Sequence, residues 1–209
     1  MSAHALYLVR MDVAHDHQAT FNEVYDREHV PNLRAVLGVR RASRYRQPSP
    51  TEPRYIAAYE MDGPAVLASA AWKAAGEAGR WPTGVRPHTM NRHLAMYEWV
   101  GGGAALTGKT PNVFWVMMDV ESHRETLFNE LYDKEHLPLL AKLDGYANAV
   151  RYRTNATDVP RYLCAYEVTK PDLPMSQAWN ETSDIGRWKP EVRPYTYNKK
   201  WILSERISA

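Results

Sequence analysis

The sequence predicts an α+β protein in which one βαββαβ unit occurs twice. The first observation is an internal repeat: a shift of 107 positions aligns Leu6 to Glu98 with Val113 to Glu205 without a gap, and 37 of the 93 aligned positions are identical. The second is that apolar, strand-like segments alternate with helical segments in each copy. The third is the composition, because 209 residues with 44% hydrophobic and 24% charged side chains are typical of a globular chain.

Each copy opens with a nearly continuous apolar strand, at 5–13 and at 112–120, which is typical of a strand covered on both faces. Pro64 opens the second helix, as proline commonly does at a first helical position. In the first copy we expect, in order, a strand at 5–13, a helix at about 17–37, a strand at 39–47, a Pro- and Ser-rich turn at 48–53, a strand at 54–61, a helix at about 64–78 and a strand at 88–100. This order predicts a ferredoxin-like unit, an antiparallel sheet with both helices on one face.

One such unit leaves an apolar sheet face exposed, and the second copy can cover it. We therefore expect the two sheets to pack face to face as an intramolecular α+β barrel. The glycines near Gly101 indicate a flexible connector. The expected organisation is repeat 1 at 1–100, a glycine-rich linker at 101–111 and repeat 2 at 112–209.

The net charge and the cysteine content limit the expected binding partners and the expected cellular compartment. The net charge of +2 gives no general reason to expect nucleic acid or a membrane as partner. The single cysteine, Cys164, cannot form an internal disulfide, which fits a reducing compartment. Residues 1–10 lack the basic region of a signal peptide, and no apolar run approaches the roughly 20 residues of a membrane span. We expect a cytoplasmic protein.

The first helix of each copy carries a Tyr-x-x-x-His-x-Pro pattern. At 100° per residue, three polar side chains of the first copy share the inward, apolar face with Phe21. These are Asn22, Tyr25 and His29, and their counterparts are Asn129, Tyr132 and His136.

Pro31 cannot donate to the carbonyl of Arg27, so the helix is expected to kink or restart just after His29. If it restarts at Pro31, His29 lies beside a new helix N-terminus, whose positive end favours a neutral imidazole that can act as a general base. Tyr25 could orient that imidazole or stabilise an oxyanion, and Glu28 could fix its tautomer. The alternative is a histidine that is a hydrogen-bonded core residue.

The motifs Tyr25-Asp-Arg-Glu-His29-Val-Pro31 and Tyr132-Asp-Lys-Glu-His136-Leu-Pro138, with the element order, resemble the dimeric α+β barrel superfamily and within it EthD-like proteins. Most relatives pair two chains, whereas this chain resembles a tandem fusion. The resemblance implies cofactor-free acid/base chemistry by the histidine, as in cofactor-independent monooxygenases, lactone isomerases and cyclases. It also leaves two alternatives open. One is a non-enzymatic ligand-binding or stress-associated barrel, and the other is haem binding, since chlorite dismutases share the barrel.

The expected catalytic residues are His29, His136, Tyr25, Tyr132, Glu28 and Glu135. The expected substrate-binding residues are Asn22, Asn129, Arg44, Arg151, Tyr59, Tyr166, Trp72 and Trp179. Matching strand parity favours buried ion pairs of Arg44 and Arg46 with Glu60, and of Arg151 and Arg153 with Glu167, over an arginine that holds a carboxylate or phenolate substrate. Tyr59 and Trp72, like Tyr45, Tyr55 and Trp81, are most simply core aromatics, although any pocket between sheet and helices would be lined by them.

The function predicted from the sequence is cofactor-free isomerase, cyclase, lyase or monooxygenase-like chemistry on a small aromatic or enolisable compound. We expect no metal, because two loop histidines such as His15 and His17 are more often solvated than metal-bound. The expected partner is a small molecule, and the chain is expected to be either a monomer with internal pseudo-two-fold symmetry or a homodimer of tandem barrels.

Overall fold

The computed structural model describes residues 4–48 and 53–208 and shows a mixture of helices and antiparallel strands. The chain divides into two compact units, Met1–Glu98 with Arg206–Ala209, and Trp99–Glu205. Most of the turn expected at 48–53 lies outside the described residues. No helix in the described ranges combines the length and the apolar character needed to cross a membrane.

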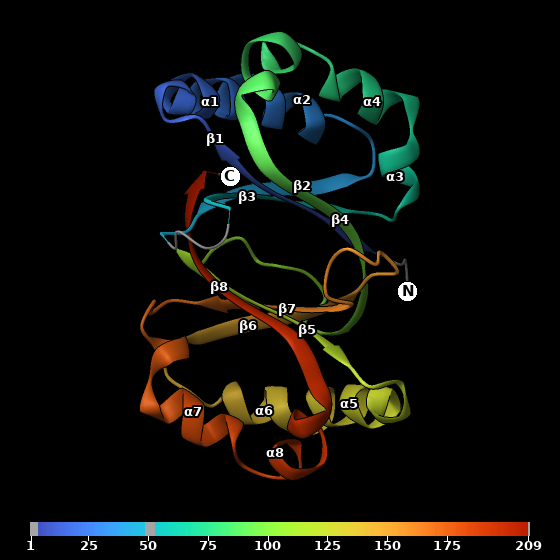
Figure 1. Cartoon of the computed structure of the whole chain (residues 1–209), viewed down its shortest axis with the longest axis vertical. Helices are drawn as coiled ribbons and strands as arrows, with labels where there is room; N and C mark the ends of the chain where they lie inside the picture. The colour runs from blue at the N-terminus through green and yellow to red at the C-terminus, as the bar shows by residue number, and fades with distance from the viewer. Residues whose placement is uncertain (1–3, 49–52, 209) are drawn as a thin grey trace. The chain divides into compact units, whose positions relative to one another are not determined.

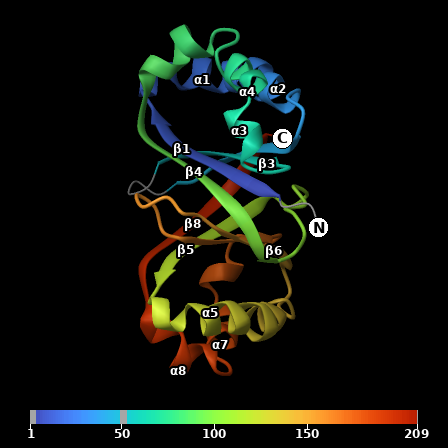
Figure 2. The same ribbon diagram turned by 90° about the vertical axis from the view of Figure 1, so that its right-hand side faces the viewer.

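The first unit builds one antiparallel sheet, in which β1 is bordered by β3 and β4, and β2 pairs with the other edge of β3. The helices lie together on one face of this sheet (Figures 1 and 2). The elements are β1 (Ala5–Val13), α1 (Gln18–Val24), α2 (Val30–Arg34), β2 (Val39–Arg46), β3 (Tyr55–Met61), α3 (Ala65–Ala68), α4 (Ala70–Gly76) and β4 (Thr89–Gly102).

The second unit repeats this order and pairing, with β5 between β7 and β8, and β6 on the far edge of β7. Its elements are β5 (Asn112–Val120), α5 (Glu125–Leu131), α6 (Leu137–Leu140), β6 (Tyr146–Arg153), β7 (Tyr162–Val168), α7 (Gln177–Ser183), α8 (Trp188–Glu191) and β8 (Thr196–Ser208).

In each unit an apolar core fills the space between the helices and the sheet. In the second unit this core includes Phe114, Val116 and Met118 of β5, while Trp115 and Met117 on the other face of the strand are buried as well. Burial on both faces explains why this strand has a continuous apolar sequence instead of an alternating one.

The first helix does not restart with Pro31 as its first residue, which was one of the two forms expected for the segment after His29. A π-helical turn over Tyr25–His29 joins α1 to α2, and the Val30 amide donates to the Tyr25 carbonyl five residues earlier. His29 itself keeps helical backbone angles, with φ −67° and ψ −50°. The wider turn accommodates the missing amide of Pro31 without breaking the helix. The second unit has the same turn over Tyr132–His136.

The segment expected as a flexible linker at 101–111 is held against the second unit by close backbone contacts and hydrogen bonds. Strand β4 continues to Gly102, where a Cβ atom would lie 2.5 Å from the carbonyl oxygen of Ala149. The buried carboxylate of Glu167 accepts hydrogen bonds from the Thr107 amide (2.7 Å), the Thr107 hydroxyl (2.8 Å) and the Gly108 amide (2.8 Å). Gly102 is therefore needed for a close backbone approach, and these bonds anchor the loop.

The second helix expected at 64–78 is also interrupted. At Ser69 the backbone is extended, with ψ 150°, and the Ser69 hydroxyl accepts from the Trp72 amide at 3.1 Å. This N-cap starts α4 separately from α3 and fixes the direction of Trp72.

Candidate active site

A pocket of about 420 Å³ lies in the first unit between helices and sheet, a volume suited to a small molecule. Its buried wall is aromatic and includes the histidine of the repeated motif. The ring-bearing residues of that wall are Tyr25, His29, Tyr59, Trp72 and Trp81, and the buried apolar side chains Val9, Met11 and Leu33 complete it.

The second unit has a pocket of about 520 Å³ at the equivalent place. Its buried wall includes the equivalent residues Tyr132, His136, Tyr166, Trp179 and Trp188. Eight of the fourteen residues expected from the sequence as catalytic or substrate-binding therefore line these two pockets.

Each histidine lies face to face with a tryptophan. The ring centroids of His29 and Trp81 are 4.3 Å apart with an interplanar angle of 22°, and those of His136 and Trp188 are 4.6 Å apart at 23°. The Tyr25 ring meets His29 edge-on at 5.0 Å. His29 is 6% exposed, and its Nδ1 has no hydrogen-bond partner within the described residues. The imidazole is thus held by ring packing.

Burial lowers the pKa of both histidines. Desolvation is the main cause for His29, followed by the positive charges of Arg86 and Arg44, and its pKa falls to about 3. For His136, desolvation and then Arg193 and Arg151 lower the pKa to about 3. Both imidazoles are therefore neutral at physiological pH. Desolvation on an apolar wall and a helix N-terminus were the two causes expected from the sequence; burial is the main cause of the lowered pKa, and nearby arginines act in place of the helix N-terminus.

Two tyrosines meet beside each histidine. In the first unit the Tyr59 hydroxyl donates to the Tyr25 hydroxyl at 3.4 Å, which leaves the Tyr25 proton available. In the second unit the hydroxyls of Tyr132 and Tyr166 are 2.8 Å apart. Desolvation raises the pKa of all four phenols, so they stay protonated and can donate hydrogen bonds.

Arg44 and Asn22 do not line the aromatic pocket. The Arg44 guanidinium is buried, donates to Asp26 (2.6 Å) and Asn22 (2.8 Å), and lies 4.5 Å from the centroid of the Tyr25 ring. The expected pair with Glu60 is not among the contacts of Arg44 in the described structure, and Glu60 Oε2 lies 3.7 Å from Arg41 Nε. Arg44 therefore packs against the Tyr25 ring and bonds to the first helix, outside the lining of this pocket.

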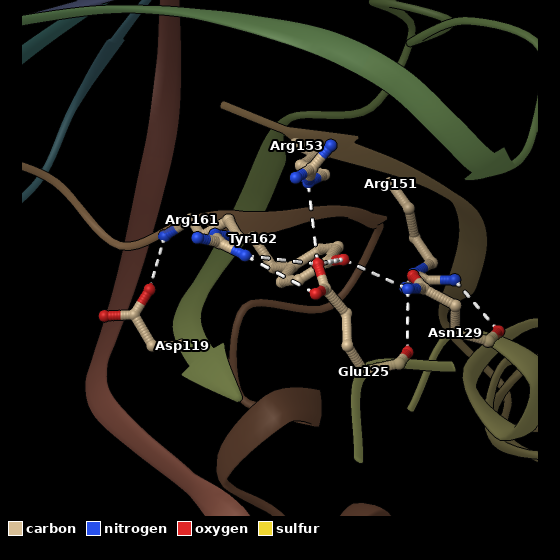
Figure 3. A network of polar contacts seen from close by, with 7 residues as sticks. All are labelled: Asp119, Glu125, Asn129, Arg151, Arg153, Arg161 and Tyr162. Atoms are coloured by element: carbon tan, nitrogen blue, oxygen red, sulfur yellow. Dashed lines mark hydrogen bonds and ion pairs between the residues drawn. The ribbon is translucent and has the colours of Figure 1, made fainter. Parts of the chain in front are cut away.

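The second unit repeats this arrangement around Arg151. Figure 3 shows Asn129 between Arg151 and Tyr162: the arginine donates to the Asn129 side-chain oxygen at 2.7 Å, and the Asn129 amide donates to the Tyr162 hydroxyl at 3.0 Å. Asn129 borders a separate polar hollow with Glu125 and Arg153, not the aromatic pocket. Arg151 also forms an ion pair with Asp133 at 2.9 Å. The Glu167 carboxylate, its expected partner, accepts hydrogen bonds from Thr107 instead.

Glu28 and Glu135 lie away from the histidine nitrogens, so the expected role in fixing the tautomer is not supported by their contacts. Glu28 accepts from the Arg80 amide at 2.8 Å and from the Arg80 side chain at 2.6 Å. Glu135 accepts from the Arg187 amide at 2.6 Å. Each carboxylate instead holds the turn that presents the stacked tryptophan.

Replacing Gly79 with alanine is expected to lower the free energy of unfolding by about 1–2 kcal/mol, because Gly79 has φ +71° and the new Cβ atom would lie 2.6 Å from Glu28 Oε2. Chemical denaturation of the two variants Gly79→Ala and Gly76→Ala measures the difference. Gly76 is the matched control, since no atom lies within 4 Å of its added Cβ. Equal stability of the two variants would contradict the proposed close packing of Gly79 against Glu28.

The sequence predicts Trp81 as a core aromatic that would also line any pocket between sheet and helices, but it singles out neither Arg86 nor the counterparts Trp188 and Arg193. All four line the pockets. The available signal was the pair of repeated blocks Gly-Arg-Trp and Val-Arg-Pro, which keep these residues at the same positions in both copies.

Within the described ranges, no group of three or more His, Cys, Asp and Glu side chains is arranged to hold a metal ion. Among the described residues that line the two pockets, each pocket has one histidine, His29 or His136, as an imidazole ligand for a metal-containing cofactor.

No protein-family profile and no curated protein sequence matches this chain. Solved structures do resemble it. A proposed monooxygenase from Fusobacterium nucleatum superposes with a TM-score of 0.68 at 12% identity, covering 99% of this chain and 94% of its own. A proposed monooxygenase from Lactobacillus acidophilus gives 0.62 at 9%, with 98% and 94% covered. A variant of the chlorite dismutase from Candidatus Nitrospira defluvii gives 0.65 at 9%, with 99% and 92% covered.

These neighbours belong to the dimeric α+β barrel superfamily, and the chain shares their α+β fold. At 9–12% identity the likeness extends to the fold alone.

Proposed function

We propose that this chain is a small-molecule enzyme of the α+β barrel type that performs cofactor-free acid/base chemistry on a small aromatic or enolisable compound. The reaction class is isomerase, cyclase, lyase or monooxygenase-like. The observation that carries the proposal is that both pockets place a buried, neutral histidine against protonated tyrosines and a tryptophan. His29 and His136 are the proposed acid/base residues.

The proposal includes the architecture expected from the sequence: two ferredoxin-like, EthD-like repeats at 1–100 and 112–209 that form one intramolecular barrel. The common order of strands in the two units supports it.

Proton transfer from a carbon acid gives the pocket residues defined roles. The substrate C–H bond breaks, its proton forms an N–H bond on His29, and the electron pair moves to the adjacent carbonyl oxygen. The Tyr25 hydroxyl, whose proton is available, can donate a hydrogen bond to that oxyanion. Protonating His29 is unfavourable beside Arg86 and Arg44, but the enolate supplies the compensating negative charge. Return of the proton to another carbon completes an isomerisation.

Haem, the cofactor that the barrel resemblance raised as an alternative, does not fit His29. A metal-ligating histidine almost always donates its second ring N–H to an acceptor, which fixes the orientation of the ring. Nδ1 of His29 is buried without such an acceptor in the described residues, and Trp81 covers one face of the ring. The surroundings of His29 therefore do not fit an axial haem ligand.

The test is solvent exchange. Small C–H acids, including aryl ketones and unsaturated lactones, are incubated with the protein in D₂O, and incorporation of deuterium is followed by proton NMR. We expect catalysed exchange that falls at least about 100-fold in the variant carrying both His29→Gln and His136→Gln, the range typical of losing a general base.

The control is Phe21→Leu, which alters the buried core behind Tyr25 but keeps both histidines. Provided that a thermal melt shows this variant to be folded, it should still catalyse deuterium exchange. Exchange that is equal in the wild type and in the double histidine variant would contradict the proposal and favour a non-enzymatic ligand-binding barrel.

A further inference from the structure

The two pockets share their buried walls but differ at their mouths. In the first unit the charged lining residues are Lys73, Glu77, Arg86 and Arg92. In the second unit the residues at the same four positions of the repeat are Asn180, Asp184, Arg193 and Lys199. The mouth of the first pocket therefore has three cations and one carboxylate, and that of the second has two cations and one carboxylate.

The carboxylate of the first mouth is already neutralised. Arg86 donates to both oxygens of Glu77, at 2.6 Å and 3.1 Å. Lys73 and Arg92 are exposed, and neither forms an ion pair with any described residue. Since His29 is neutral, this pocket keeps an uncompensated charge of about +2, from these two side chains, at physiological pH.

The second mouth keeps a smaller excess of positive charge. Asp184 accepts from Arg193 and, at 2.7 Å, from Lys189. Asn180 stands where the first unit has Lys73, so Lys199 is the one lining cation of this pocket without an ion pair among the described residues.

The second mouth is also more apolar. Trp201 occupies the repeat position of Leu94 and is 62% exposed. Met175, which lines the same pocket, is 61% exposed. Phe114 replaces Tyr7. A larger cavity with an exposed tryptophan suits a longer apolar ligand.

We propose that both pockets bind planar aromatic carboxylates, with the ring against the histidine and tryptophans and the carboxylate at the cationic mouth. The first pocket selects dicarboxylates through Lys73 and Arg92, and the second selects larger monocarboxylates through Lys199 and Trp201. This assignment rests on the proposed function, since it names the substrate class of the same sites. Carboxylates are favoured because arginine and lysine form charge-assisted hydrogen bonds with them, and aromatic rings because the buried walls are aromatic.

The binding test uses three probes of one shape: 2-naphthoate, naphthalene-2,6-dicarboxylate and the neutral 2-naphthamide. The ring-proton signals of His29 and His136 report on the two pockets separately by NMR, assigned by their loss in His29→Gln and His136→Gln. We expect the dicarboxylate to bind at least about tenfold more tightly at His29 than at His136, with the reverse order for 2-naphthoate. The amide should bind at least about tenfold more weakly than 2-naphthoate at both.

Exchanging one residue between the two mouths provides the matched control. Lys73→Asn gives the first pocket the residue of the second, and Asn180→Lys does the opposite. The first variant should lose about tenfold in dicarboxylate affinity at His29 only, and the second should gain a similar factor at His136 only. Naphthyl phosphate is included to separate carboxylate recognition from recognition of any anion, and equal or tighter phosphate binding would overturn the carboxylate assignment.

Two results would overturn the proposal as a whole: amide and carboxylate binding with equal affinity, or unchanged affinities in both exchange variants. The outcome is separable from that of the enzymatic proposal, because binding is measured without turnover. Histidine-dependent exchange of neutral ketones without carboxylate binding would reject only the substrate class. Selective carboxylate binding without any exchange would reject only the acid/base function.

Discussion

Replacing Asp26 with asparagine is expected to lower the free energy of unfolding by about 3 kcal/mol. The change leaves the Arg44 guanidinium, 2% exposed, without its carboxylate partner, and an unpaired buried charge typically costs about 3–5 kcal/mol. The lower end applies because the Asp26 side chain is 39% exposed, and because Asn22 still accepts from Arg44.

Chemical denaturation measures this cost, with Glu23→Gln as the control. Glu23 also pairs with an arginine, Arg80, but both side chains are about half exposed, so that loss should be much smaller than the loss caused by Asp26→Asn. Asp133→Asn should reproduce the large effect in the second unit, because Arg151 is equally buried. If Asp26→Asn lowers the free energy of unfolding no more than Glu23→Gln does, the buried Arg44 guanidinium does not depend on the Asp26 carboxylate, and the prediction is wrong.

Acidification is expected to destabilise the protein through its two pocket histidines. Their folded pKa values, about 3, lie below the value of about 6.5 expected in the unfolded chain. Between these values the unfolded state binds protons that the folded state does not, so stability falls as the pH falls from about 6.5 towards 3. Each histidine contributes a slope of up to about 1.4 kcal/mol per pH unit.

Unfolding free energies measured between pH 6 and pH 4 test this slope. His29→Gln and His136→Gln should each reduce it by up to about 1.4 kcal/mol per pH unit. Carboxylates also titrate in this range, so the comparison is made between variants. An unchanged slope in both pocket variants would show that the imidazoles are solvated.

Much of the fold was predictable because it depends on local periodicity and on the repeat. The apolar run at 5–13, the βαββαβ order and the equivalence of the two copies all follow from the sequence pattern, and the structure has β1 at Ala5–Val13. The helical wheel also placed Tyr25 and His29 inward, and both line a pocket.

The partners of the charged residues were not predictable from the pattern. Strand alternation suggested that Arg44 would meet Glu60, but Arg44 reaches the helix and bonds with Asp26, 18 residues away in sequence. Glu28 is on the edge of the helix face and contacts a turn 52 residues further along. Such contacts depend on how separate elements pack, which single-sequence periodicity does not contain.

The π-helical turn at Tyr25–His29 inserts one extra residue into an otherwise continuous helix. A residue adds about 100° of rotation in an α-helix, so this insertion sets the rotational phase between Phe21 on one side and Leu33 on the other, both of which are buried. Deleting a single residue here would turn one end of the helix out of the core by about a quarter of a revolution. The gap-free alignment of the two copies therefore preserves the relative rotation of the two halves of this helix as well as its side chains. Any relative that keeps this pocket should keep the length of this turn.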